Sequence, residues 1–125
     1  MILGLGTDLV EVGRVEDIYR RHGDRFLDRV FTPTERADCL GRARPAIHLA
    51  GRVAAKEAAM KALGTGWAGG VHWTDIEVQA TAGGAPALTF GGGARRHAES
   101  RGIRQSWLSL SHDGDYATAV VIVTD

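Results

Sequence analysis

An alanine-rich stretch at residues 52–66 constrains the fold of this chain more than any other segment. It reads Arg-Val-Ala-Ala-Lys-Glu-Ala-Ala-Met-Lys-Ala-Leu-Gly-Thr-Gly. Up to Gly64, which is a natural left-handed C-cap, nearly every residue is a strong helix former. Alanine on nearly every face predicts a helix that is enclosed on several sides and whose backbone approaches its neighbours closely.

Two charged residues of this helix, Glu57 and Lys61, stand four positions apart. At about 100° per residue, Glu57 lies among Val53, Ala54 and Met60, so apolar residues surround its carboxylate. An exposed Glu–Lys pair at this spacing would contribute only about 0.3–0.5 kcal/mol. In an enclosed helix, the two charges must either compensate each other or bind a cation and an anion from outside. The Gly-Thr-Gly that follows leaves backbone N–H groups open to a phosphate or a nucleobase edge.

The size and composition of the chain narrow the classes of function. Its 125 residues fit one domain over residues 1–125, and its formal net charge of zero gives no sign of nucleic-acid binding. No apolar run nears the roughly 20 residues that span a membrane, and the N-terminus has no signal-peptide pattern. Cys39 is the only cysteine, which excludes an internal disulfide and a cysteine-based zinc cluster. A reducing cytoplasm fits these features.

The N-terminal pattern predicts a strand over residues 1–10. Asp8 falls on the same face as Gly4 and Gly6, whose missing side chains leave room beside it. The third glycine of a dinucleotide-binding fingerprint is missing, so that motif is rejected. Two interpretations of Asp8 stay open: a helix N-cap, because its spacing to Glu11 is that of a capping box, or a metal-ligating carboxylate at a strand end.

A helix is expected over residues 11–22, and one of its faces is basic with an apolar centre. Arg14, Ile18 and Arg21 fall at positions i, i+4 and i+7. The stripe is either an ordinary solvated face or a docking site for an acidic partner helix.

The middle of the chain predicts two further helices. Thr32 or Thr34 caps a short helix that ends near Arg42, and a long central helix follows over residues 47–63. His48, near the start of the long helix, reads as a surface or capping histidine, because no second metal ligand stands at a suitable spacing.

Beyond Gly66 the pattern changes to the period of two that is typical of strands. The expected elements are two hairpins with a short helix between them: strands 75–80 and 87–90, helix 91–100, and strands 107–112 and 116–123. His112, at the mouth of the second hairpin, is either a hydrogen-bonded strand-end histidine or an anion-binding or proton-handling group. Together the elements predict an α+β fold, with a small antiparallel sheet packed against helices, one of them long and central.

Three segments taken together closely resemble the holo-[acyl-carrier-protein] synthase family, the small bacterial 4′-phosphopantetheinyl transferases. They are Gly-Leu-Gly-Thr-Asp at residues 4–8, the helix at 52–66, and Leu-Ser-His-Asp at 110–113. The resemblance covers essentially the whole chain in the same order. It implies the phosphopantetheinyl transferase fold and transfer of the 4′-phosphopantetheine group from coenzyme A to a serine of an apo-acyl carrier protein. It also implies Mg²⁺ dependence and a homotrimer with active sites at the subunit interfaces.

The resemblance also implies roles for individual residues. Asp8 and Glu57 would hold Mg²⁺, and Glu57, Lys61 and His112 would be catalytic. The basic stripe of Arg14, Ile18 and Arg21 would dock the carrier. The implied nucleotide site consists of Arg52, Lys61, Gly64, Thr65, Gly66, Pro86 and His112.

Two points stay open. Ala85 stands where many relatives carry lysine or arginine, so it receives no role. The general base is a metal-bound water, Glu57 or Asp113.

A rival hypothesis is a non-catalytic module that binds coenzyme A or a nucleotide, in which Glu57 and Lys61 are only structural. A plain oligomeric scaffold is disfavoured, because it leaves the enclosed carboxylates without a purpose.

Overall fold

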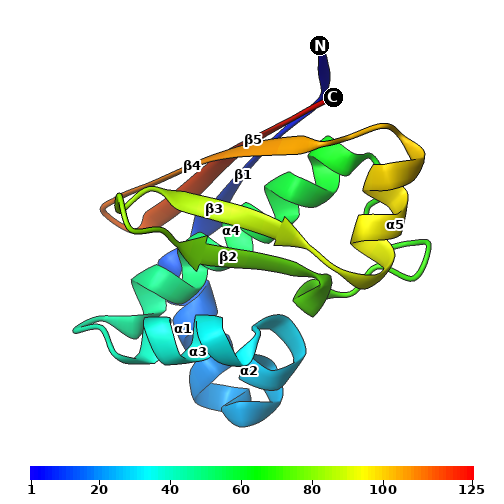
Figure 1. Cartoon of the computed structure of the whole chain (residues 1–125). Helices are drawn as coiled ribbons and strands as arrows, with labels where there is room; N and C mark the ends of the chain where they lie inside the picture. The colour runs from blue at the N-terminus through cyan, green and yellow to red at the C-terminus, as the bar shows by residue number, and fades with distance from the viewer.

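The long helix α4 (Pro45–Leu63) runs through the middle of the molecule in the computed structural model, which describes residues 1–125 (Figure 1). Most of its residues are buried, as its alanine content predicted. The helix begins two residues earlier than expected, because Pro45 occupies the first turn, where its missing N–H is not needed. Gly64, at φ 82°, ends the helix in the left-handed conformation.

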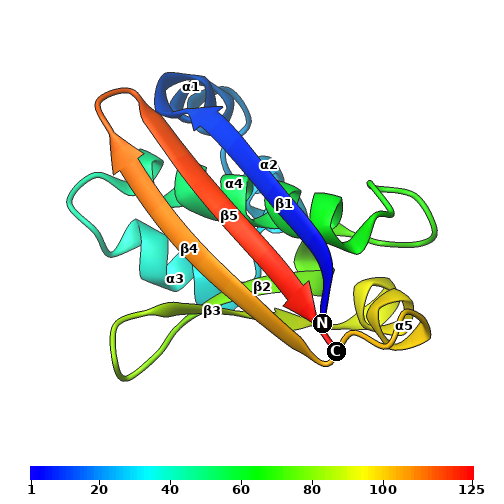
Figure 2. The ribbon, with the colours of Figure 1, turned by 90° about the horizontal axis from the view of Figure 1, so that it is seen from above.

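A three-stranded antiparallel sheet in the order β1-β5-β4 packs one face against α4 (Figure 2). Its strands are β1 (Ile2–Glu11), β4 (Gln105–Asp113) and β5 (Tyr116–Thr124). The chain termini meet at one corner of this sheet, where the Met1 amino group lies 2.5 Å from Asp125 Oδ1. The α+β class with a small antiparallel sheet and a central helix is confirmed.

Two glycines of β1 allow the sheet and α4 to touch backbone to backbone. A Cβ on Gly4 would lie 2.0 Å from the carbonyl oxygen of Ala62, and one on Gly6 would lie 1.8 Å from that of Ala58. Any side chain would therefore push the helix away. The room that the sequence predicted beside Asp8 is filled by the backbone of α4.

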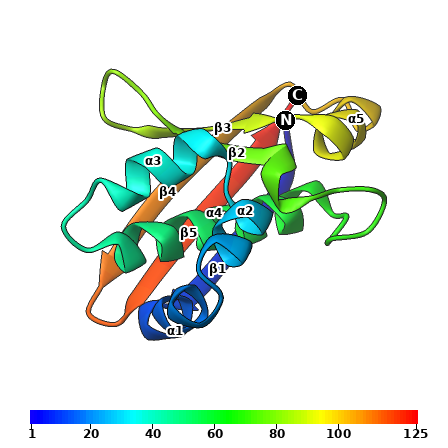
Figure 3. The same cartoon turned by 90° about the horizontal axis from the view of Figure 1, so that it is seen from below.

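A second hairpin, β2 (Ile76–Ala80) and β3 (Pro86–Phe90), lies along α4 next to β4 (Figures 1 and 3). Trp73–Asp75 forms a short 3₁₀ helix before it, so the strand starts one residue later than expected. Helix α5 (Gly92–Ser100) follows the hairpin. Buried residues of β2, α5, α4 and β5 form one hydrophobic core, against which β3 packs partly buried side chains.

Three short helices pack around the first half of α4 and enclose a second group of buried apolar residues. They are α1 (Val12–His22), α2 (Asp24–Val30) and α3 (Pro33–Leu40). Thr32 caps α3 through a capping box with Glu35, which decides between the two threonines, and the helix ends before Arg42. The N-cap of α1 is Glu11, and Asp8 lies within β1. The capping interpretation of Asp8 was therefore wrong.

The outer face of the three-stranded sheet, turned away from α4, carries large apolar side chains. Five of them are between 40% and 63% exposed: Leu5, Leu9, Trp107, Tyr116 and Val120. None of the helices is both long enough and apolar enough to cross a membrane.

Candidate active site

The structure brings Asp8 of β1 and Glu57 of α4 into one cavity. The cavity has a volume of about 200 Å³ and lies at the β1 edge of the sheet, between β1, α1 and α4. Its other walls are mostly apolar and include Val53 and Trp73. Two acids far apart in the sequence thus share one partly buried site.

The neighbouring positive charges do not fully compensate the negative charges of Asp8 and Glu57. Burial, followed by the effect of the neighbouring Asp8 carboxylate, raises the pKa of Glu57 from 4.5 to about 6. Lys61 and Arg14 act in the opposite direction but do not cancel the rise. Oδ2 of Asp8 is buried, and no donor reaches it. A cation between the two carboxylates would remove both features, because it would favour the charged form of Glu57 and bind the free oxygen of Asp8.

Lys61 pairs with Asp8 rather than with Glu57. Its Nζ lies 3.1 Å from Asp8 Oδ1 and 2.9 Å from the carbonyl oxygen of Thr7. The expected alternative of a mutual Glu57–Lys61 pair was therefore wrong. The Lys61 side chain is 57% exposed, so the remaining N–H of its ammonium can reach an anion in solution.

The available ligands fit Mg²⁺ better than a structural zinc ion. Mg²⁺ is commonly held by one or two carboxylates, with water and phosphate oxygens completing its coordination. Asp8 and Glu57 provide such a pair, and the free Oδ2 of Asp8 provides an open ligand position. No group of three or more His, Cys, Asp or Glu residues in the chain could hold a metal, whereas structural zinc needs four protein ligands.

The basic stripe of α1 borders the same cavity. Arg14 and Ile18 line it, and Arg21 is exposed one turn beyond Ile18. The stripe therefore leads from the outer surface to the two carboxylates.

Arg52 and His112 lie at the opposite, β4 edge of the sheet. They line a separate cavity of about 140 Å³ together with His48. The Arg52 guanidinium bonds to Asp38. Sequence reasoning missed His48, because its neighbour His112 comes from a distant strand.

The remaining nucleotide-site candidates do not gather within one chain. Gly64, Thr65 and Gly66 form the turn after α4, whereas Pro86 starts β3 at the other side of the molecule (Figures 1 and 2). In the loop before Pro86, the carbonyl of Ala85 accepts a hydrogen bond from the Thr81 hydroxyl.

Comparisons with known proteins agree on one family. The family model described as the 4′-phosphopantetheinyl transferase superfamily matches residues 4–121. Holo-[acyl-carrier-protein] synthase from Koribacter versatilis (strain Ellin345) is 50% identical over 125 residues, which cover both chains completely. The chain belongs to the holo-[acyl-carrier-protein] synthase family of phosphopantetheinyl transferases.

Solved structures of this synthase family share the fold. The crystal structure of holo-[acyl-carrier-protein] synthase from Neisseria meningitidis superposes with a TM-score of 0.92 at 35% identity and covers all of both chains. The Helicobacter pylori enzyme, in complex with coenzyme A, gives a TM-score of 0.85 at 31% identity and covers 96% of this chain and 99% of its own.

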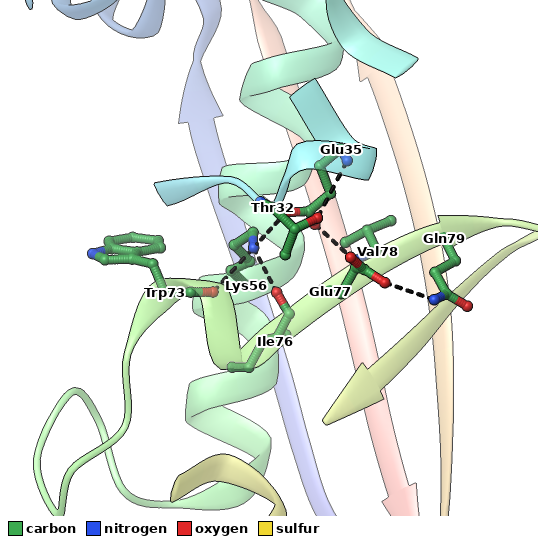
Figure 4. Close-up of polar contacts among 8 residues, drawn as sticks. All are labelled: Thr32, Glu35, Lys56, Trp73, Ile76, Glu77, Val78 and Gln79. Atoms are coloured by element: carbon green, nitrogen blue, oxygen red, sulfur yellow. Dashed lines mark hydrogen bonds and ion pairs between the residues drawn. The ribbon is translucent and has the colours of Figure 1, made fainter. Parts of the chain in front are cut away.

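A buried ion pair in this synthase gave no signal in the sequence (Figure 4). Nζ of Lys56 lies 2.8 Å from Glu35 Oε1, and both side chains are completely buried. Lys56 also donates to the carbonyls of Trp73 at 3.0 Å and Ile76 at 2.5 Å, and Glu35 accepts from the Val78 N–H at 2.7 Å. Burial lowers the pKa of Lys56, while Glu35 opposes that change. The network joins α3, α4 and the start of β2 just beside Glu57.

A second unpredicted feature of the synthase is a pair of stacked tryptophans. The rings of Trp67 and Trp73 lie 3.9 Å apart between centroids and are inclined by 33°. Trp73 forms part of the Asp8–Glu57 cavity wall. The loop after α4, which carries Trp67, therefore packs against this wall.

Proposed function

We propose that this chain transfers the 4′-phosphopantetheine group from coenzyme A to a serine of apo-acyl carrier protein, at the cavity of Asp8 and Glu57. The other product is adenosine 3′,5′-bisphosphate. The observation that supports this site best is the pair of acids, with an unbonded buried oxygen on Asp8 and a raised pKa on Glu57. The coenzyme A bound to the Helicobacter pylori relative supports the choice of donor.

Asp8, Glu57 and Lys61 each have a task in this reaction. Asp8 and Glu57 would hold Mg²⁺, which would neutralise the negative charge that develops on the 5′-phosphate of the departing nucleotide. Lys61, already fixed by Asp8 and Thr7, presents its free N–H to a phosphate oxygen. The serine oxygen forms a bond to the phosphorus of the phosphopantetheine group, and the bond from this phosphorus to the nucleotide breaks.

The serine proton must leave during the same step. Within one chain, Asp113 lies at the end of β4, two strands away from the β1 edge, which is about 10 Å across the sheet. Glu57 lines the cavity itself. Glu57 is therefore favoured over Asp113 of the same chain, and the alternatives are a metal-bound water and Asp113 of a neighbouring chain, which follows His112 directly in sequence.

We further propose a homotrimer whose active sites combine residues of two chains. The Asp8–Glu57 cavity and the Arg52–His112 cavity lie at opposite edges of one sheet, with α4 between them. One donor molecule bound by both sets would have to lie between neighbouring chains. The exposed apolar face of the three-stranded sheet offers a surface that such an assembly would bury.

The carrier is proposed to dock on the stripe of Arg14, Ile18 and Arg21. The stripe is basic at its ends and apolar at its centre, which suits an acidic carrier helix with an apolar face. Because Arg14 and Ile18 border the Asp8–Glu57 cavity, a serine at the start of such a helix would be delivered beside the carboxylates.

On this proposal, residues 1–125 act as one transferase domain in fatty-acid biosynthesis, in the cytoplasm. Mass spectrometry tests the reaction directly. The protein is incubated with coenzyme A, Mg²⁺ and an apo-carrier, and the carrier should gain the mass of phosphopantetheine. EDTA and Glu57→Gln should each abolish the gain. A non-catalytic module that binds coenzyme A would bind the donor but leave the mass of the carrier unchanged.

A further inference from the structure

The cavity at the β4 edge has the composition of an anion site. Its polar side chains are His48 and Arg52 of α4 and Ser111 and His112 of β4, and no carboxylate lines it. Its volume of about 140 Å³ leaves room for a group of phosphate size. The positive end of the α4 dipole lies close by, since His48 is in the first turn of this 19-residue helix.

Arg52 has an unused donor in this cavity. Its side chain is only 10% exposed, and its terminal nitrogen bonds to Asp38. Its Nε–H has no acceptor. A buried donor without a partner costs about 1–3 kcal/mol, and guanidinium groups bind phosphate through several N–H groups at once. An anion in the cavity would accept a hydrogen bond from this Nε–H and so remove the free-energy cost of the unpaired donor.

His48 faces mainly positive neighbours. Burial, followed by repulsion from Arg42, Arg52 and His112, lowers the pKa of His48, and only Asp38 acts in the opposite direction. The imidazole is therefore biased towards its neutral form as long as no anion is near. A phosphate oxygen beside it would favour the charged form instead.

We propose that His48 binds a phosphate group of the donor nucleotide together with Arg52 and His112. This inference rests on the proposed function, because the nucleotide is the donor of that reaction. It assigns a binding role to a histidine that the sequence pattern ranks as an ordinary surface residue. The phosphate is either the 3′-phosphate monoester of coenzyme A or its diphosphate, and both offer the same anionic oxygens.

The proposal has a measurable consequence for protons. If phosphate binding charges His48, the protein takes up a proton as the donor binds. Because the protonated form binds the anion more tightly, affinity should increase as the pH falls from 8.5 to 6.5. Arg42, Arg52 and His112 are all present in a His48 variant, so the difference between wild type and variant isolates His48.

Isothermal titration calorimetry of coenzyme A and of dephospho-coenzyme A, which lacks the 3′-phosphate, provides the test. His48→Gln should weaken binding about tenfold at pH 6.5, the loss expected for one charged hydrogen bond, and much less at pH 8.5. His48→Lys should retain the affinity and lose the part of the pH dependence that His48 contributes, which would not happen if the histidine were merely structural. His22→Gln, at the exposed end of α1, removes one histidine outside the cavity and serves as the matched control.

The two donors identify the phosphate. A loss confined to coenzyme A assigns His48 to the 3′-phosphate, and an equal loss for both donors assigns it to the diphosphate. The proposal is overturned if His48→Gln binds both donors within twofold of wild type at both pH values, with unchanged proton uptake. Failure of the wild-type protein to bind coenzyme A would instead contradict the proposed function itself.

Discussion

Lys56 and Glu35 form an ion pair of 2.8 Å in which neither side chain is exposed to solvent. Desolvating two charges is costly, and this pair is tolerated because backbone groups satisfy both partners. The pair also joins α3 and the start of β2 to the helix that carries Glu57.

Lys56→Met should therefore destabilise the protein strongly. The substitution leaves a buried carboxylate on Glu35 without its partner, which typically costs about 3–5 kcal/mol. Urea unfolding of both proteins measures the difference. Arg95→Met is the control, because it breaks the exposed Arg95–Glu99 pair of α5 and should cost less than about 1 kcal/mol. Equal losses in the two variants would contradict the importance of burial.

Glu57→Gln should stabilise the metal-free protein at pH 8 while abolishing transfer. The folded protein raises the pKa of Glu57 from 4.5 to about 6, so ionised Glu57 opposes folding. This cost is absent below pH 4.5, where the carboxyl is protonated in both states, and it is complete above pH 6. The two pKa values correspond to about 2 kcal/mol, which solvent screening reduces towards about 1 kcal/mol.

Unfolding in EDTA at pH 4 and pH 8 measures this effect. The variant should gain stability over wild type only at the higher pH, and Glu16→Gln on the exposed surface of α1 should gain none. A stability difference independent of pH would show that ionisation of Glu57 is not its cause.

Much of this architecture could be predicted from the sequence, because its signals are local. Period-two segments, the alanine-rich helix and Gly64 predicted the strands and α4 to within about two residues. The convergence of Asp8 and Glu57 was predicted from the family resemblance. The partner of Lys56 was not predicted, because Lys56 reads as one more helix former and Glu35 belongs to a separate short helix. Likewise, His48 and His112 meet only through the packing of β4 on α4.

Gly6→Ala should weaken the contact between β1 and α4. The new Cβ would lie 1.8 Å from the carbonyl oxygen of Ala58, so the helix backbone has to move. Overpacking of this kind costs about 3 kcal/mol, which a thermal or urea unfolding curve would show. Gly13→Ala is the matched control, because its Cβ would meet nothing closer than 3.7 Å and alanine is the better helix former. A Gly6→Ala protein as stable as this control would mean that α4 adjusts without cost.

The Cys39 thiol should be unreactive in the folded protein. Burial, as the main cause, raises the pKa of this thiol from 9.0 to about 11. At pH 8 the thiolate that attacks a disulfide reagent is then only about one part in a thousand, and the side chain is fully buried. Labelling with a chromogenic disulfide should be slow in buffer and rapid in concentrated urea. Rapid labelling of the native protein would indicate that α3 opens readily.

Charge reversal on α1 should separate the two substrates of the proposed reaction. Arg21→Glu places a negative charge on the docking stripe, one turn beyond the cavity wall, and an acidic carrier should be repelled. We expect the carrier KM to rise about tenfold or more, while the coenzyme A KM stays within about twofold.

Arg14→Glu should raise the carrier KM as well. However, Arg14 also lines the cavity and favours the charged form of Glu57, so this variant changes the carboxylate site as well as the stripe, and Arg21→Glu is the cleaner test. Arg96→Glu, on α5 and outside both cavities, changes the net charge equally and should leave both KM values unchanged. If Arg21→Glu and Arg96→Glu have the same effect on the carrier KM, the carrier senses only overall charge, and the stripe on α1 is not its docking site.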